Sequence, residues 1–334
     1  MRDLTKYNES TLQNLDNCIE DELKRIMNNQ LTLISFIDVW LELFKKNSIK
    51  IASFARLQSS KETLKKYEIS QKKICEISFF DIQRYINSLV DDGYSLSNIK
   101  KQVLIVTAPL KQAAAMRVIG ADPSVGIQMP SEAKVQKKAR EVIAYTKEEQ
   151  EKLWKKIVQN INNTGYAAVA FEIETGLRAG ELLALKWSDV DINHCKMRIH
   201  ATILNPQYTN KASYQDSAKS KSSHRTIPLT PKAIVILKQL KERRTTEWVF
   251  EQDGERYSYQ KLTYQTRKLC REAKIPYHGE HVFRHTFATN CYYKGIDVKI
   301  LSRMMGHSSV QVTYNIYINL YGDGFDDMYA ALCF

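Results

Sequence analysis

The apolar residues in the first half of the chain recur at intervals of three and four, which is the spacing of amphipathic helices. The spacing is clearest at Phe36, Trp40, Leu43 and Phe44, and again at Ile99, Val103, Val106, Leu110 and Ala114. Gly and Pro rarely interrupt these stretches, although Pro109 is expected to kink the second one. The pattern predicts a bundle of about four helices over roughly residues 32–122.

The chain is expected to form two main domains joined by a linker. Asp122 and Pro123 end the helical bundle, and the segment that follows has few apolar residues. A capping box at Thr146 and Glu149 then starts the second domain. The expected divisions are an N-terminal helical extension at 1–31, a bundle domain at 32–128, a linker at 129–145 and a second domain at 146–334.

The linker is basic, with Lys134, Lys137, Lys138 and Arg140 set against Glu132 and Glu141. One interpretation is a strap that contacts DNA. The other is a solvated tether that contacts nothing, because runs of charge are usually solvated.

The second domain is expected to be helical apart from one small antiparallel sheet. Residues 197–202 and 225–229 alternate polar with apolar side chains, as strands do. The Ser- and Lys-rich stretch between them, residues 205–224, is expected to be a loop. The predicted fold class is therefore mainly α: a helical bundle followed by a mixed, mostly helical domain with a small antiparallel sheet.

The balance of charge indicates a polyanionic partner. Lys and Arg number 49 against 37 Asp and Glu, a net charge of +12, and basic groups held near phosphates release condensed counterions. The longest apolar stretch, residues 31–44, contains Asp38 and Glu42 and is too short to span a bilayer. No membrane partner is therefore expected. The six cysteines form no Cys-x-x-Cys pair, so we expect a reducing cytoplasmic setting.

The first candidate site residue is Arg178. A helix is expected to end at Gly176 and a new one to start near Arg178, where free backbone N–H groups favour an anion. The guanidinium fork matches phosphate oxygens in a bidentate way. The alternative is an exposed arginine that pairs with Glu181, three residues further on.

The second candidate is Lys219, which lies on the loop that runs into the strand at 225–229. A lysine on a mobile loop can protonate a leaving oxygen if nearby cations lower its pKa. Lys221 is a rival for this role, and a solvated charge without function is the alternative for either residue.

The third stretch places His281 and Arg284 on one helix face, three residues apart, while Phe283 and Phe287 face the core. One imidazole and one guanidinium then point the same way. A zinc site at His281 and His285 is the competing interpretation, although no further ligand is evident beside them.

The fourth stretch contains His307 and Tyr317. Gly306 is expected to close a helix, with His307 at the turn and a new helix from Ser308 or Ser309. Tyr314, Tyr317 and Tyr321 fall on one face of that helix, and such a stripe is ordinarily core.

The order and spacing of these four stretches together resemble the catalytic set of the tyrosine recombinases, the phage-integrase family. The shared features are Thr-Gly-Leu-Arg-x-x-Glu, a Lys before a strand ending Ile-Pro-Leu, His-x-x-Arg-His, and Met-Gly-His-Ser-Ser with a Tyr ten residues after its His. The resemblance covers about residues 146–320, and the bundle is similar to the family's core-binding (SAM-like) domain. It implies catalytic roles for Arg178, Lys219, His281, Arg284, His307 and Tyr317.

The sequence departs from the family pattern in two places, Met305 where Leu is frequent and Asn319 where His commonly follows the nucleophile. Neither belongs to the catalytic set. Residues 1–30 are too few for the small arm-binding domain that many integrases carry at this end.

The resemblance implies a site-specific recombinase that cuts and rejoins DNA through a 3′-phosphotyrosine, without a cofactor or metal. The implied partners are double-stranded DNA with inverted-repeat core sites, three further copies of the chain in a homotetramer on that DNA, and accessory DNA-bending or directionality factors. Integration or excision of a mobile element is the expected role. A Xer-like chromosome-dimer resolvase, a type IB topoisomerase and a non-catalytic DNA-binding protein are the alternatives.

Overall fold

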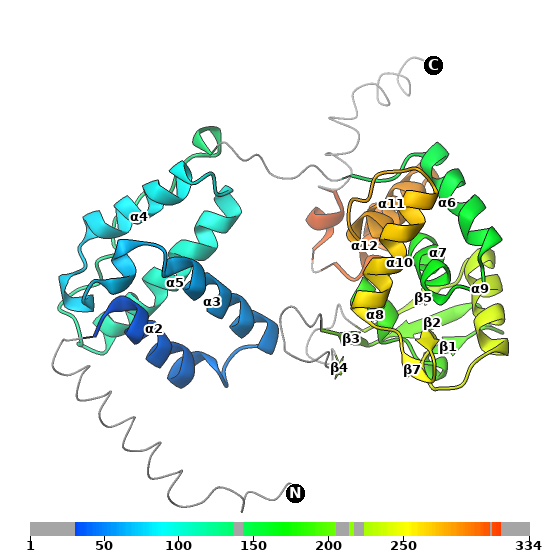
Figure 1. Ribbon diagram of the computed structural model, residues 1–334, viewed down its shortest axis with the longest axis horizontal. Coiled ribbons are helices and arrows are strands. Elements are labelled where there is room, and N and C mark those ends of the chain that lie inside the picture. Colours follow the sequence, from blue (N-terminus) through cyan, green and yellow to red (C-terminus); the bar gives the residue numbers. More distant parts are fainter. Residues whose placement is uncertain (1–30, 136–142, 205–213, 217–223, 308, 315–334) are drawn as a thin grey trace, which may run out of the picture. The chain divides into compact units, whose positions relative to one another are not determined.

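The computed structural model describes residues 31–135, 143–204, 214–216, 224–307 and 309–314. The chain divides into two compact units, Met1–Arg140 and Glu141–Phe334, each with its own hydrophobic core (Figure 1). Residues 1–30 of the expected N-terminal extension and residues 136–142 of the expected linker lie outside the described residues. So do three residues of the expected site region, Lys219, Lys221 and Tyr317.

The first unit is a helical bundle, as predicted from the apolar spacing. Its α-helices are α2 (Leu33–Trp40), α3 (Ile51–Leu64), α4 (Phe79–Asp91) and α5 (Leu96–Ala115). The long helix α5 packs against the other three and continues past Pro109. The prediction that Leu43 belongs to the buried face is wrong, because Leu43 is 49 % exposed. Leu43 lies in a π-helical turn, Leu41–Lys45, which has more residues per turn than an α-helix. The turn therefore rotates Leu43 away from the core-facing side of α2.

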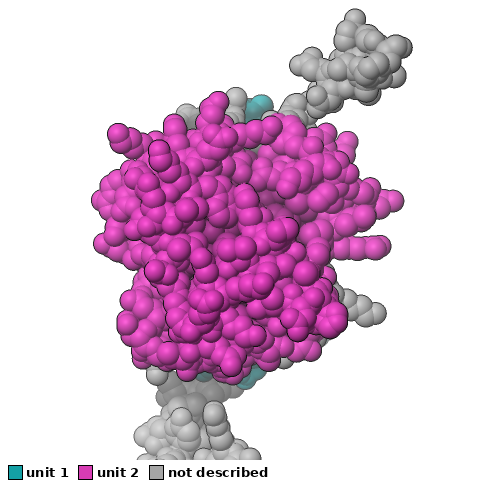
Figure 2. Space-filling view, turned by 90° about the vertical axis from the view of Figure 1, so that its right-hand side faces the viewer, with its two compact units in different colours: residues 1–140 teal, residues 141–334 magenta. Residues whose placement is uncertain are grey.

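The second unit is built around one buried helix, α7 (Thr164–Thr175). It packs against α6, α9, α10 and α11 (Figure 1). The helices around it are α6 (Lys147–Gln159), α8 (Ala179–Leu183), α9 (Pro231–Glu242), α10 (Tyr259–Glu272), α11 (His281–Tyr293) and α12 (Val298–Met305). The expected capping box of Thr146 and Glu149 is present at the start of α6. Figure 2 shows one face of this unit in space-filling form, with residues 141–334 in magenta.

The β structure is small and antiparallel, as expected, but it forms more than one sheet. Strand β2 (Lys196–Ile199) pairs with β1 (Val190–Asp191) and with β5 (Arg225–Pro228), with Met197 opposite Ile227. A separate pair joins β3 (Ala201–Ile203) to β4 (Tyr214–Asp216). A third, β6 (Glu251–Gln252) with β7 (Glu255–Arg256), forms a hairpin.

The prediction of one strand over 197–202 is therefore wrong, because the strand breaks at His200. The Nε2 atom of His200 lies 3.0 Å from Oδ1 of the buried Asp189, outside either ladder. The expected loop over 205–224 is also corrected, since its residues Tyr214–Asp216 form β4. Among the described residues, no helix is long and apolar enough to cross a membrane.

Candidate active site

Two helix ends meet at the candidate site, each closed by a glycine in the left-handed conformation. Gly176 (φ +64°) ends α7 and Gly306 (φ +64°) ends α12, both as the sequence predicted. Glycine is required at position 176 for two reasons: its backbone is left-handed, and a Cβ there would lie 2.3 Å from a ring carbon of Phe287. The carbonyls released at these two ends become acceptors for arginine side chains.

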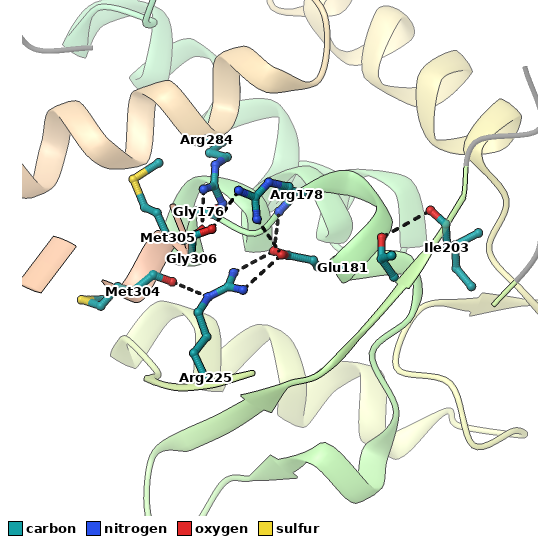
Figure 3. A network of polar contacts seen from close by, with 10 residues as sticks. Gly176, Arg178, Glu181, Ile203, Arg225, Arg284, Met304, Met305 and Gly306 are labelled. Carbon is teal, nitrogen blue, oxygen red and sulfur yellow. Dashed lines mark hydrogen bonds and ion pairs between the residues drawn. The ribbon is translucent and has the colours of Figure 1, made fainter. Parts of the chain in front are cut away.

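Arg284, on the first turn of α11, joins the two helix ends. Its Nη1 donates to the Gly176 carbonyl at 2.6 Å, and its Nη2 donates to the Met305 carbonyl (Figure 3). Arg284 is only 4 % exposed. Burial, then the neighbouring charge of Arg178, lowers the pKa of Arg284 to about 9, so it stays protonated at neutral pH.

Arg178 lies beside Arg284 at the N-terminus of α8, as expected (Figure 3). Its Nη1 donates to Glu181 Oε1 at 2.8 Å, and its Nη2 donates to the Gly306 carbonyl at 3.0 Å. The alternative of a pair with Glu181 is therefore correct as a contact. The pair is part of a larger network, however, and the Arg178 side chain remains 38 % exposed.

A third arginine, Arg225, completes the network, and sequence reasoning missed it. It occupies the first position of β5, and its Nη1 and Nη2 donate to the two carboxylate oxygens of Glu181 at 3.1 and 2.7 Å. Burial alone would raise the pKa of Glu181, but Arg225 and then Arg178 hold it at about 2. Two guanidinium groups thus contact one carboxylate, and the charge of Arg284 acts on it from nearby, which leaves the site positive.

The histidines of the site are neutral at neutral pH. Desolvation by the surrounding protein, then Arg284 and Arg178, lower the pKa of His281 at the start of α11. The same causes, with Arg225, lower the pKa of His307 to about 3, and burial with His281 lowers that of His285 to about 4. The Nδ1 atom of His307 lies 2.7 Å from the hydroxyl of Thr313.

The structure thus brings Arg178, Arg284 and His307 together, with His281 on the same helix as Arg284 and near both charges. Lys219 and Tyr317 lie outside the described residues, but the elements that precede or follow them are described. β4 and β5 bracket the segment with Lys219, and residues 310–314 are helical just before Tyr317. The rings of His281 and His285 are 6.4 Å apart, and no group of three candidate metal ligands occurs among the described residues.

Comparison with known proteins identifies the architecture. The sequence profile of the phage integrase family matches residues 138–322. A tyrosine recombinase XerC-like protein of Caldanaerobacter subterraneus is 27 % identical over 313 residues, covering 87 % of this chain and 80 % of that protein. The integrase of Staphylococcus phage L54a is 24 % identical, covering 90 % of this chain and 94 % of that one.

Among solved structures, the Tn1549 transposon integrase in complex with transposon right end DNA superposes with a TM-score of 0.76 at 18 % identity. The alignment covers 91 % of this chain and all of the other, so the fold is shared over both units. This chain belongs to the phage integrase family, and its second unit is a tyrosine recombinase catalytic domain.

Proposed function

We propose that this protein integrates or excises a mobile element by site-specific recombination, with Tyr317 as the nucleophile. The observation that carries the proposal is the union of Arg178, Arg284 and the turn before His307 in one network. The names of two relatives, a phage integrase and a transposon integrase, support a mobile element as the source of the DNA.

The arginines neutralise charge on the scissile phosphate. Attack on a phosphodiester concentrates negative charge on the non-bridging oxygens, and guanidinium groups stabilise that charge without reorganisation. Arg178 is the group that can reach a ligand, because its side chain is 38 % exposed. The buried charge of Arg284 adds to the field at the same point.

His281 is the proposed general base and His307 a hydrogen-bond donor. A neutral His281 can take the phenol proton as the Tyr317 oxygen attacks phosphorus, since its pKa is below the ordinary value. When the Thr313 hydroxyl donates to Nδ1 of His307, the proton of the imidazole is on Nε2, which then donates to a non-bridging oxygen.

Lys219 completes the step as general acid. As the bond from Tyr317 to phosphorus forms, the bond from phosphorus to the 5′ oxygen breaks, and Lys219 supplies the proton that this oxygen takes up. The product is a 3′-phosphotyrosyl link and a free 5′ hydroxyl. Attack by a 5′ hydroxyl of a partner duplex reverses the chemistry and releases Tyr317, so the exchange consumes no nucleotide cofactor.

The proposed partners are duplex DNA with inverted-repeat core sites and three further copies of this chain in a tetramer. Accessory DNA-bending or directionality factors would set the direction of the reaction. The charge of +12 fits the DNA partner. The proposed location is the cytoplasm, where such DNA is accessible.

A Xer-like chromosome-dimer resolvase is the second candidate, favoured by the 27 % identity to a XerC-like protein. Sequencing the DNA bound in the source cell separates the two. Binding at the ends of a mobile element supports an integrase, and binding at one chromosomal site supports a resolvase. Relaxation of a plasmid with two sites, without recombination, would indicate a topoisomerase.

The test of the chemistry is a covalent adduct with a duplex that the wild-type protein selects from random-sequence DNA, called here the selected duplex. Tyr317→Phe should bind this duplex but form no adduct, whereas Tyr314→Phe and Tyr321→Phe should form it. Adduct formation should persist in excess EDTA. Absence of any wild-type adduct would contradict the proposed function, and an adduct lost in EDTA and restored by zinc would favour the zinc alternative at His281 and His285.

A further inference from the structure

Arg225 is buried in the arginine network of the catalytic unit, although none of the proposed chemical steps uses it. Its side chain is 7 % exposed, and it is the first residue of β5. The segment that contains Lys219 ends just before this strand. A buried arginine costs stability unless its donors are satisfied, so the partners of Arg225 indicate what it does.

The partners of Arg225 belong to two other parts of the site. Nη1 and Nη2 contact the two carboxylate oxygens of Glu181, and Nε donates to the Met304 carbonyl at 2.6 Å (Figure 3). Glu181 contacts Arg178 through its Oε1, and Met304 lies at the end of α12, two residues before Gly306. Arg225 therefore connects β5, α8 and the end of α12.

The geometry of this link requires a guanidinium group. Two parallel donors, Nη1 and Nη2, hold the carboxylate end-on, and a third donor, Nε, points to a separate acceptor. A lysine ammonium carries donors on one atom and cannot span Glu181 and Met304 in this way. Because the fork holds both oxygens of Glu181, it fixes the plane of the carboxylate that Arg178 also contacts.

Direct contact of Arg225 with a phosphate does not fit these observations. Each of its three nitrogens already donates within the protein, and its side chain is as buried as that of Glu181. Arg178 differs, with 38 % of its side chain exposed. Of the two arginines, Arg178 is therefore the one with side-chain surface available to a ligand.

We infer that Arg225 is a positioning residue, which fixes Glu181 and the end of α12 so that Arg178 presents its guanidinium group to the scissile phosphate. The inference rests on the proposed function, since it assigns Arg178 to that phosphate. It predicts that loss of Arg225 weakens charge neutralisation in the cleavage step more than it weakens DNA binding.

The test measures single-turnover adduct formation by Arg225→Gln on the selected duplex. Loss of a charge-assisted pair should lower the rate constant by about 10- to 100-fold, with the affinity for the duplex changed by less than about threefold. Arg198→Gln is the matched control, because Arg198 is an exposed arginine of the same sheet, paired with Asp189. It should keep the wild-type rate constant.

A second substrate distinguishes a role of Arg225 in positioning Arg178 from a general loss of structure in the variant. A methylphosphonate at the scissile position lacks the negative charge that Arg178 neutralises, so the Arg225→Gln defect should shrink there, as should that of Arg178→Gln. An equal defect on both substrates would show that Arg225 is merely structural. A wild-type rate constant for Arg225→Gln on the normal duplex would also overturn the inference.

Two further variants cover the remaining outcomes. If Arg225→Gln does not fold, Arg225→Lys is tested instead, because lysine keeps the positive charge but lacks the guanidinium fork. A wild-type rate constant for Arg225→Lys would overturn the inference. In the double variant Glu181→Gln with Arg225→Gln, the defect should be close to that of Glu181→Gln alone, and additive defects would contradict a shared path. Failure of the wild-type protein to form any adduct would instead contradict the proposed function itself.

Discussion

The Nδ1 atom of His307 lies 2.7 Å from the hydroxyl oxygen of Thr313, a side chain that is completely buried six residues further along the chain. The contact holds the imidazole at the turn beyond α12 in one orientation. Burial, Arg284, Arg178 and Arg225 lower the pKa of His307 to about 3, so the ring is neutral when it makes this contact. A neutral imidazole donates from one nitrogen only, and its partner decides which one.

Thr313→Val should therefore reduce cleavage by about tenfold, because valine keeps the shape of threonine but cannot hold Nδ1 of His307. Thr313→Ser keeps the hydroxyl and should retain most of the rate. The measurement is single-turnover adduct formation on the selected duplex at neutral pH. Equal rates for the valine and serine variants would show that the hydroxyl does not set the imidazole tautomer.

Gly176→Ala should destabilise the second unit more than an equivalent change elsewhere. Alanine at φ +64° costs about 1–2 kcal/mol, and the contact of its Cβ with Phe287 at 2.3 Å adds about 1–3 kcal/mol. Gly295→Ala is the control, because Gly295 has φ +72° but open space around it. Urea unfolding should show a clearly larger loss in the free energy of unfolding for Gly176→Ala than for Gly295→Ala. Equal losses would mean that the Phe287 side chain moves to make room for the added Cβ.

The sequence predicted most of this architecture because its signals are local. The helix ends at Gly176 and Gly306 follow from glycine's access to the left-handed conformation, and the capping box at Thr146 follows from its neighbour at 149. The grouping of Arg178, Arg284 and His307 followed from motif order and spacing, and their catalytic roles stay predictions. None of these predictions required knowledge of contacts between distant segments.

The features that sequence reasoning missed depend on such contacts. Arg225 is 44 residues from Glu181 along the chain, and only its place at the start of a strand after the lysine segment could have singled it out. The break at His200 had no local signal, because polar and apolar residues alternate across it, and the nearby Asp189 is eleven residues away along the chain. The β6–β7 hairpin was also not predicted, although it has a local signal: Asp253 and Gly254 both have positive φ, as such turns require.

Glu172→Gln should stabilise the protein increasingly as pH rises above about 4.5. Glu172 is 1 % exposed, its Oε2 has no hydrogen-bond partner among the described residues, and burial raises its pKa well above the ordinary value. A carboxyl with a raised pKa contributes stability below its unfolded pKa, near 4.5, and loses it as pH rises towards the folded pKa. The glutamine variant should gain on the wild type by about 1.4 kcal/mol for each pH unit in that window.

Urea unfolding at several pH values measures this gain. Glu174→Gln, on the same helix, controls for the substitution itself because it retains Glu172. A constant difference between Glu172→Gln and the wild type would show that Glu172 is ionised in the folded protein.

The final prediction concerns the proposed general acid, Lys219, which lies between β4 and β5 along the chain. Lys219→Ala should fail to cleave the selected duplex, because the 5′ oxygen is a poor leaving group without a proton. It should cleave the same duplex when the bridging 5′ oxygen is replaced by sulfur, since a thiolate leaves unprotonated. Lys221→Ala should cleave both.

This comparison also bears on the arginine network. Arg178→Gln should be impaired on the sulfur-bridged duplex too, because its non-bridging oxygens still carry the charge to be neutralised. Rescue of Lys221→Ala, with Lys219→Ala active on normal DNA, would move the acid to Lys221. Rescue of Arg178→Gln together with Lys219→Ala would instead place Arg178 on the leaving-group side of the phosphate, and the charge that Glu181 and Arg225 hold in place would then serve proton transfer.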